Sequence, residues 1–139
     1  MGKLPLWTFA GYITEAGSRI VQEWYDSLPI EEYEELQDLL NYMASAEKWT
    51  RPDFDKVTSP LHEIRVKANI ANHEIRVYGV FNREVRRQFL FLHGVTAKKK
   101  DRDKKGQDIA LARLALLKQR KASTNEFVVE SRTTSQDKA

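Results

Sequence analysis

Apolar residues in the first half of the chain recur with helical spacing, on one face of each of two predicted helices. The first stripe consists of Ile20, Val21, Trp24, Tyr25 and Leu28. Pro29 can end this helix and open the next one, whose stripe consists of Tyr33, Leu36, Leu40 and Met43. We therefore predict an antiparallel pair of amphipathic helices, preceded by a short strand at 4–13.

Beyond residue 60 the apolar period changes from helical to alternating. Residues 61–67 place Ile64 and Val66 on one face, and 73–81 alternate in the same way. Residues 85–93 are more apolar and follow after a tight turn. Three consecutive strands with short links predict an antiparallel meander. The segments 48–60 and 94–106 are rich in turn formers or charge and are predicted to be loops.

The helical period returns at 107–121, where Ile109, Ala112 and Leu116 share one face. The order of elements predicts an α+β fold: an N-terminal strand, a two-helix hairpin, a three-stranded antiparallel meander and a C-terminal helix. We expect the helices to pack on one face of the sheet. Residues 1–121 would form one domain, and 122–139 a polar C-terminal tail that is partly disordered.

Composition limits the cellular setting. The 139-residue chain contains no cysteine, which excludes disulfides and thiolate metal sites and agrees with a reducing compartment. No apolar run approaches the length of a membrane span, and the start has no signal-peptide pattern. We therefore expect a cytoplasmic protein with no membrane role.

Charge is distributed unevenly along the chain. Residues 1–61 hold 5 Lys and Arg against 11 Asp and Glu, whereas residues 62–139 hold 18 against 9. The halves therefore carry net charges of −6 and +9, which agree with the overall +3. A basic half suggests a polyanionic partner, although two independently solvated surfaces would look the same in sequence.

The cations of the basic half converge on the predicted meander. Arg65, Lys67, Arg76 and Tyr78 alternate with the apolar residues, so they share the opposite face of the sheet. The third strand leads into a lysine-rich run at 98–105, interrupted by two aspartates. Like charges placed this close destabilise a fold unless an anion neutralises them, which favours phosphate recognition over a merely solvated face.

The sequence gives little support to several other chemistries. There is no phosphate-binding G-x-x-x-x-G-K-[ST] loop and no G-x-G-x-x-G dinucleotide fingerprint. The histidines at 62, 73 and 93 lack metal-ligand spacing, and no nucleophile-elbow motif is present. We expect no cofactor and no metal.

RNA cleavage by attack of the 2′-hydroxyl on the adjacent phosphate requires neither a metal nor a cofactor. It needs fixed positive charge near the developing oxyanion, which Arg and Lys can provide. It also needs a proton acceptor that is uncharged near neutral pH. His93, at the end of the third strand, and Lys67, close to Arg65, are the two candidates, while a hydrogen-bonded core role is the other interpretation of His93.

Residues 61–117 resemble the RelE/ParE superfamily, specifically its HigB-like, phage-derived branch. The first two strands carry Leu61, Glu63, Ile64, Arg65 and then Ile75, Arg76, Val77. The third strand and the last helix carry Phe91, Leu92, His93, Gly94 and then Asp108, Ile109, Ala112, Arg113. With the upstream helical segment, the resemblance covers about residues 5–120.

This resemblance implies the toxin of a type II toxin–antitoxin system, a ribosome-dependent endonuclease (mRNA interferase) that needs no metal. The implied partners are mRNA at the ribosomal A site and a cognate antitoxin, often a helix-turn-helix DNA-binding protein, with a heterotetramer as one expected assembly. The expected catalytic residues are Arg65, Lys67, Arg76, His93, Lys98 and Lys99. The expected RNA-binding residues are Tyr78, Lys100, Arg102, Lys104 and Lys105.

The chain departs from the branch in two places. Several superfamily members carry a catalytic tyrosine after the basic segment, whereas Tyr78 is the last tyrosine here. The lysine run also lacks the threonine–proline element of the branch. Two other functions therefore stay open: a non-catalytic module that binds RNA or protein through a degenerate toxin fold, and a ParE-like toxin that acts on gyrase.

Overall fold

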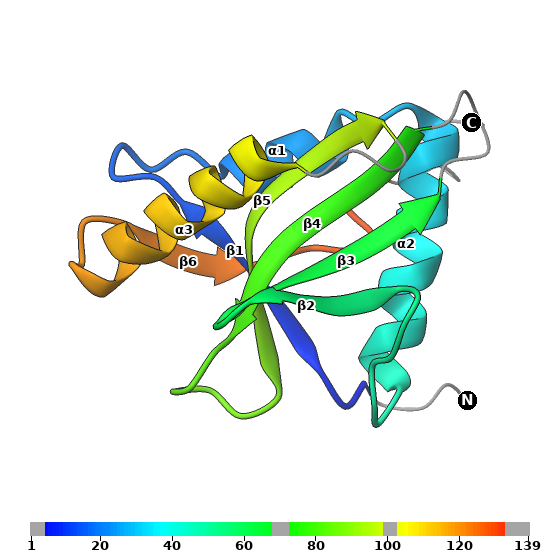
Figure 1. Cartoon of the computed structure of the whole chain (residues 1–139), viewed down its shortest axis with the longest axis horizontal. Helices are drawn as coiled ribbons and strands as arrows, with labels where there is room; N and C mark the ends of the chain where they lie inside the picture. Colours follow the sequence, from blue (N-terminus) through cyan, green and yellow to red (C-terminus); the bar gives the residue numbers. More distant parts are fainter. Residues whose placement is uncertain (1–4, 68–72, 99–102, 133–139) are drawn as a thin grey trace.

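Within the residues that the structure describes, six strands form one mixed sheet that carries helices on both faces (Figure 1). The computed structural model describes residues 5–67, 73–98 and 103–132. The first elements in the chain are β1 (Thr8–Ile13), α1 (Ile20–Asp26), α2 (Ile30–Ser45) and β2 (Phe54–Thr58). They are followed by β3 (Leu61–Lys67), β4 (His73–Phe81), β5 (Gln88–Lys98), α3 (Lys104–Lys118) and β6 (Ser123–Glu126).

The strand order is β2-β3-β4-β5-β1-β6. Strands β2 to β5 form an antiparallel meander, as alternating apolar and polar residues predicted for three of them. Strand β1 then pairs parallel with β5, Phe9 lying opposite Phe89, and β6 closes the other side of β1 as an antiparallel edge strand. The first strand of the chain thus lies inside the sheet.

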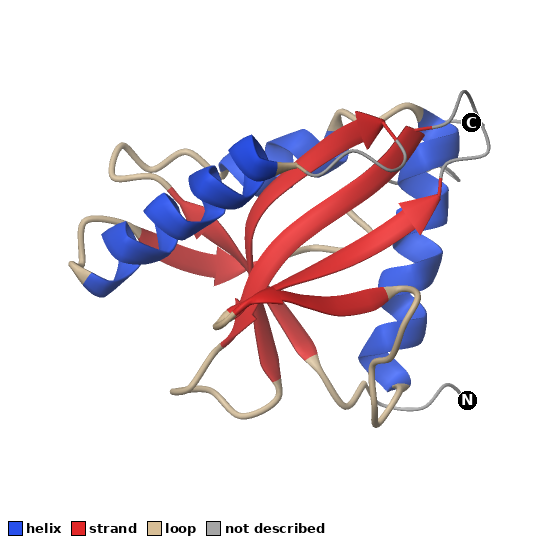
Figure 2. Ribbon diagram, in the orientation of Figure 1, coloured by secondary structure: helices blue, strands red, loops and turns tan. Residues whose placement is uncertain are grey.

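Alternation along β4 assigns its side chains to the two faces. Tyr78 is hydrogen-bonded to Asp103 at the start of α3, so this face is the one that α3 covers. A Cβ atom on Gly79 would instead meet the Phe89 ring, on the opposite face. Figure 2 shows α3 in front of the sheet, and α1 and α2 behind it.

The core lies mainly between the sheet and the α1–α2 pair. Its centre is a chain of aromatic contacts in which Phe91 stacks on Phe9 at 5.0 Å and meets Phe127 edge-on at 4.7 Å. Helix α2 contributes the fully buried Tyr33 and Leu40 on the stripe that the sequence predicted. Such interlocked rings bury large apolar areas and add edge and stacking contacts.

The structure corrects several sequence predictions of the fold. The predicted loop 48–60 contains strand β2, and the predicted tail 122–139 begins with strand β6, so the sheet is larger than a three-stranded meander. The helices pack on both faces rather than one. Strand β5 continues to Lys98 and so includes the first five residues of the predicted loop 94–106. In the described part of the chain, no helix has the length and apolar character needed to cross a bilayer.

Candidate functional site

The pentapeptide HEIRV occurs twice, at 62–66 and at 73–77, and the two copies are paired antiparallel in β3 and β4. The register places Arg65 directly opposite Arg76. Because the two copies run in opposite directions, Glu63 lies opposite Tyr78 and Lys67 lies opposite Glu74. The glutamates and arginines of both copies, together with Lys67 and Tyr78, share the sheet face on which α3 lies, whereas His62 lies on the other face and packs against Phe54.

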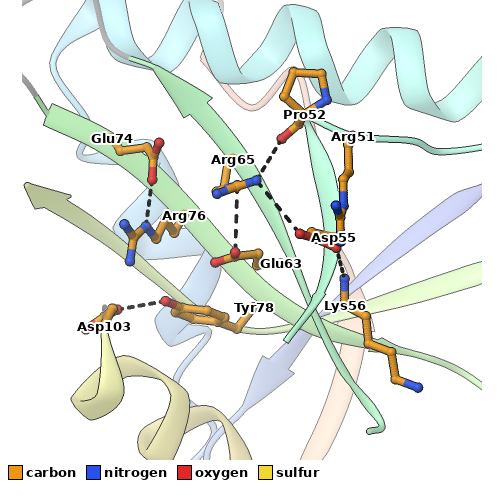
Figure 3. A network of polar contacts seen from close by, with 10 residues as sticks. All are labelled: Arg51, Pro52, Asp55, Lys56, Glu63, Arg65, Glu74, Arg76, Tyr78 and Asp103. Atoms are coloured by element: carbon orange, nitrogen blue, oxygen red, sulfur yellow. Dashed lines mark hydrogen bonds and ion pairs between the residues drawn. The ribbon is translucent and has the colours of Figure 1, made fainter. Parts of the chain in front are cut away.

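Carboxylates accompany both arginines, as Figure 3 shows. Arg76 Nε donates to Glu74 Oε1 at 2.8 Å, and both side chains are more than nine-tenths buried. Arg65 is more exposed and lies 3.7 Å from Glu63 and 4.0 Å from Asp55 of β2. The two arginines therefore sit side by side, but with acidic neighbours rather than as a bare cationic patch.

Arg65 is the less satisfied of the two arginines. Its Nε is buried and has no hydrogen-bond partner among the described residues, because the Glu63 oxygen at 3.7 Å is too far away. Its Nη2 donates a long bond of 3.4 Å to the Pro52 carbonyl. An unsatisfied guanidinium N–H is costly to bury. The donor that an added anion could reach is the weakly bonded Nη2 at the partly exposed end of the side chain.

Burial affects the charge state of the neighbouring acid. Burial raises the pKa of Glu63 above its ordinary value of 4.5, although Arg65 and Arg76 oppose this shift. Glu63 is therefore held in its charged form less firmly than an exposed glutamate. An anion that approaches Arg65 competes with this carboxylate, which lies 3.7 Å away.

Tyr78 connects the arginine pair to the first turn of α3. Its hydroxyl donates to Asp103 Oδ2 at 3.0 Å, while Asp103 Oδ1 accepts from the Gly106 amide and so caps the helix. A Cβ on Gly106 would lie 2.0 Å from Asp103 Oδ2, so a larger residue there would displace the carboxylate that caps the helix. Burial raises the pKa of Tyr78 above its ordinary value of 10, with Asp103 adding to the effect and the nearby Arg76 opposing it. Tyr78 thus stays protonated.

His93 lies opposite Tyr78 on β5, with the two rings parallel and 6.4 Å apart. Next to it the β4–β5 ladder contains an irregularity, because Tyr78 pairs with His93 and Gly79 with Phe91, which leaves Leu92 as an extra residue. Arg113 of α3 donates to the Leu92 carbonyl at 2.8 Å and contacts His93 Nδ1 at 3.3 Å.

Arg113 determines which nitrogen of His93 carries the proton. A guanidinium can only donate, so His93 Nδ1 accepts and Nε2 bears the hydrogen. Burial, together with the Arg113 charge, lowers the pKa of His93 below its ordinary value of 6.5 against the opposing effect of Asp103. His93 is therefore neutral at pH 7 and is arranged as a hydrogen-bond donor through Nε2. Its accepting nitrogen is occupied.

The remaining predicted residues lie around this network. Lys67 is exposed at the end of β3, and Lys104 and Lys105 are exposed in the first turn of α3, where Lys104 contacts Asp108 at 2.8 Å. The backbone of Lys98 ends β5 opposite His73, and its side chain is outside the described part. Lys99, Lys100 and Arg102 lie outside the described residues.

Sequence reasoning overlooked the acidic partners Glu63, Glu74 and Asp103 and the role of Arg113. The twice-repeated HEIRV was the available signal: a glutamate two residues before an arginine on a strand lies on the same face, next to it. No group of three or more His, Asp or Glu side chains in the described ranges could hold a metal ion. Comparison of the chain with known protein families and with curated proteins finds no match.

Proposed function

We propose that the protein is the toxin of a type II toxin–antitoxin pair and cleaves mRNA on the ribosome without a metal. The observation that carries this proposal is the direct pairing of Arg65 with Arg76 across β3 and β4. Opposite residues on one face of an antiparallel pair have their Cβ atoms roughly 5 Å apart, so two guanidinium groups can reach one phosphate. The ordered motifs that resemble HigB-like toxins support the same function.

In this proposal each residue has a defined role. Arg65 and Arg76 stabilise the charge that develops on the phosphate oxygens as the 2′-oxygen attacks and the bond to the 5′-oxygen breaks. His93 donates a hydrogen bond from Nε2 without giving up its proton, because it is neutral. Lys67, exposed at the end of β3, is the group that takes the proton of the 2′-hydroxyl and returns it to the departing 5′-oxygen. The products are a 2′,3′-cyclic phosphate and a 5′-hydroxyl.

The ion pairs favour one other function, that of a non-catalytic module that binds RNA or a protein. Arg76 is already bound by Glu74, and the accepting nitrogen of His93 is already occupied by Arg113. Because these polar groups already have partners within the protein, the network could stabilise the fold as well as act on a substrate. A module of this kind would bind RNA and leave it intact.

Induced expression followed by primer-extension mapping of transcripts separates these functions. We expect wild-type protein to arrest growth and to produce new transcript ends. Arg65→Gln removes the less satisfied guanidinium and should reduce cleavage by roughly 10²-fold, the usual scale for loss of one group that stabilises an oxyanion. Arg86→Gln, an exposed cation in the β4–β5 turn, is the matched control and should cleave like wild type.

A charge-neutral second variant guards against misfolding. Arg76→Ala would leave Glu74 buried and unpaired, whereas Glu74→Gln with Arg76→Gln removes both charges together. Loss of cleavage in this double variant, with an unchanged thermal midpoint, supports the assignment. Wild-type protein that binds RNA in a salt-dependent manner without new transcript ends indicates the binding module instead. Wild-type protein that does neither contradicts both.

A further inference from the structure

A pocket of about 600 Å³ lies between the sheet and the C-terminal half of α3, at the other end of this helix from Asp103. Its apolar wall includes Val80 and Leu90 from the sheet and Leu114 and Leu117 from the helix. Pockets of this size lined mostly by apolar side chains are typical of sites for small molecules. None of these residues belongs to the Arg65–Arg76 site.

Cations outnumber acids among the residues that line this pocket. Arg83 comes from the β4–β5 turn, and Lys118 and Arg120 come from the end of α3, whereas Glu84 is the single carboxylate of the lining. All four side chains belong to exposed residues, so their charges lie at the rim, above the apolar wall. An apolar cavity with a cationic rim matches a molecule that is apolar at one end and anionic at the other.

Arg120 occupies a backbone position that suits glycine. The end of α3 is closed by hydrogen bonds from the Arg120 amide to the Leu117 carbonyl and from the Lys121 amide to the Leu116 carbonyl. This Schellman arrangement requires a left-handed residue after the helix, and Arg120 adopts it with φ of 60°. A side chain with a Cβ is disfavoured there, so glycine would stabilise the helix end better than arginine does.

We propose that this pocket binds a small amphiphilic anion, with its apolar part against Leu114, Leu117 and Leu90 and its acidic group at Arg120. Lys118 and Arg83 add positive charge at the same rim. The ligand class comprises monomeric carboxylates or sulfates that carry an alkyl chain or an aromatic ring. The proposal is independent of RNA cleavage, because it uses neither the arginine pair nor His93.

Isothermal titration of the full chain with dodecanoate, kept below its micelle concentration, tests the proposal. We expect saturable binding at one site, and weaker binding of dodecanol, which has the same chain without the charge. Arg120→Gly should bind dodecanoate roughly tenfold more weakly, the scale expected for loss of a charge-assisted hydrogen bond. The same variant should unfold at a higher temperature than wild type, because glycine suits the left-handed position.

Lys48→Gln removes one exposed positive charge away from the pocket and should leave dodecanoate affinity unchanged. Equal weakening in Lys48→Gln and Arg120→Gly would mean that net charge alone attracts the anion, and it would overturn the proposal. Wild-type protein without saturable binding would also overturn it, as would an Arg120→Gly variant with wild-type affinity. If Arg120 had only a structural role, Arg120→Gly would not raise the melting temperature and weaken dodecanoate binding at the same time.

Discussion

Arg65 and Arg76 illustrate how a pair of like charges is accommodated on a sheet. Two guanidinium groups directly opposite each other repel, and neighbouring carboxylates offset that repulsion. Glu74 binds Arg76 closely, whereas Glu63 and Asp55 approach Arg65 only to 3.7 and 4.0 Å. Arg65 is therefore the residue at which an external phosphate can gain most.

Acidification provides a test of the His93 environment. Because the folded pKa of His93 lies below the ordinary 6.5, the unfolded chain binds more protons as pH falls through 6.5. The free energy of unfolding should therefore decrease below that pH, by up to about 1.4 kcal/mol per pH unit for each such group. His93→Gln should show a shallower decrease in denaturant unfolding between pH 7.5 and 5.5.

Two other groups contribute to the same pH profile. The pKa of His62 is also lowered, mainly by burial, so His62→Gln should flatten the profile as well. Glu63 acts in the opposite direction, because its raised pKa makes the folded state the better proton binder above pH 4.5. An unchanged slope in His93→Gln would show that this ring is no less basic in the folded state.

The sequence predicted the basic side chains of the candidate site but not their acidic partners. Period-two alternation located Arg65, Lys67, Arg76 and Tyr78 on one face, since a strand places every second residue together. The register that brings Arg65 opposite Arg76 depends on how two strands pair, and alternation within one strand does not contain it. Asp103, at the start of α3, and Arg113, within this helix, lie far from β3 and β4 in the sequence, so the pattern of those strands could not predict them.

Among the elements, β3 and β4 agree with their predicted ranges because strict alternation spans their whole length. Strand β2 was missed because its neighbourhood is rich in Pro, Asp and Ser, which are typical of loops. It forms because Phe54 and Val57 find partly buried positions at the edge of the sheet. Burial available only in the folded protein thus overrides the local preference.

The contact between α1 and β5 depends on one small residue. A Cβ on Gly94 would lie 2.2 Å from the Trp24 ring, which is far inside contact distance. Gly94→Ala should lower the free energy of unfolding by about 1–3 kcal/mol, as overpacked cores usually do. Denaturant unfolding of this variant measures the loss.

A double-mutant cycle assigns that loss to its cause. In a Trp24→Leu background the ring is gone, so Gly94→Ala should cost clearly less than in wild type. A cost that is the same in both backgrounds would show that the glycine is needed for its backbone conformation or for another contact.

At the scale of the whole molecule, the segment after α3 connects the sheet to helices α1 and α2. Strand β6 pairs with β1, and Phe127 inserts between Phe91 and Tyr25. Tyr25 and Tyr33 then donate to the Val129 carbonyl at 2.5 and 3.2 Å. The sequence of the segment after α3 is mostly polar, so it did not predict this role. A single buried aromatic residue, Phe127, fixes the segment against the core.

Phe127→Ala should therefore destabilise the protein by about 3–5 kcal/mol, the usual cost of removing a buried aromatic ring. The adjacent Val128 is 41% exposed and provides the control, because Val128→Ala should change stability by no more than about 0.5 kcal/mol. Thermal or denaturant unfolding compares the two. Equal, small effects would mean that residues after 122 behave as a tail.

The interior position of β1 affects how the protein can fold during its synthesis. This strand is made before both of its neighbours in the sheet, since Ala10 pairs with Leu90 of β5 and with Glu126 of β6. The helical pair and strands β2 to β4, with the arginine pair, are synthesised while β1 has both edges open. A nascent chain can therefore complete the native sheet only once β6 has been made, and until then the open strand β1 is a target for chaperones.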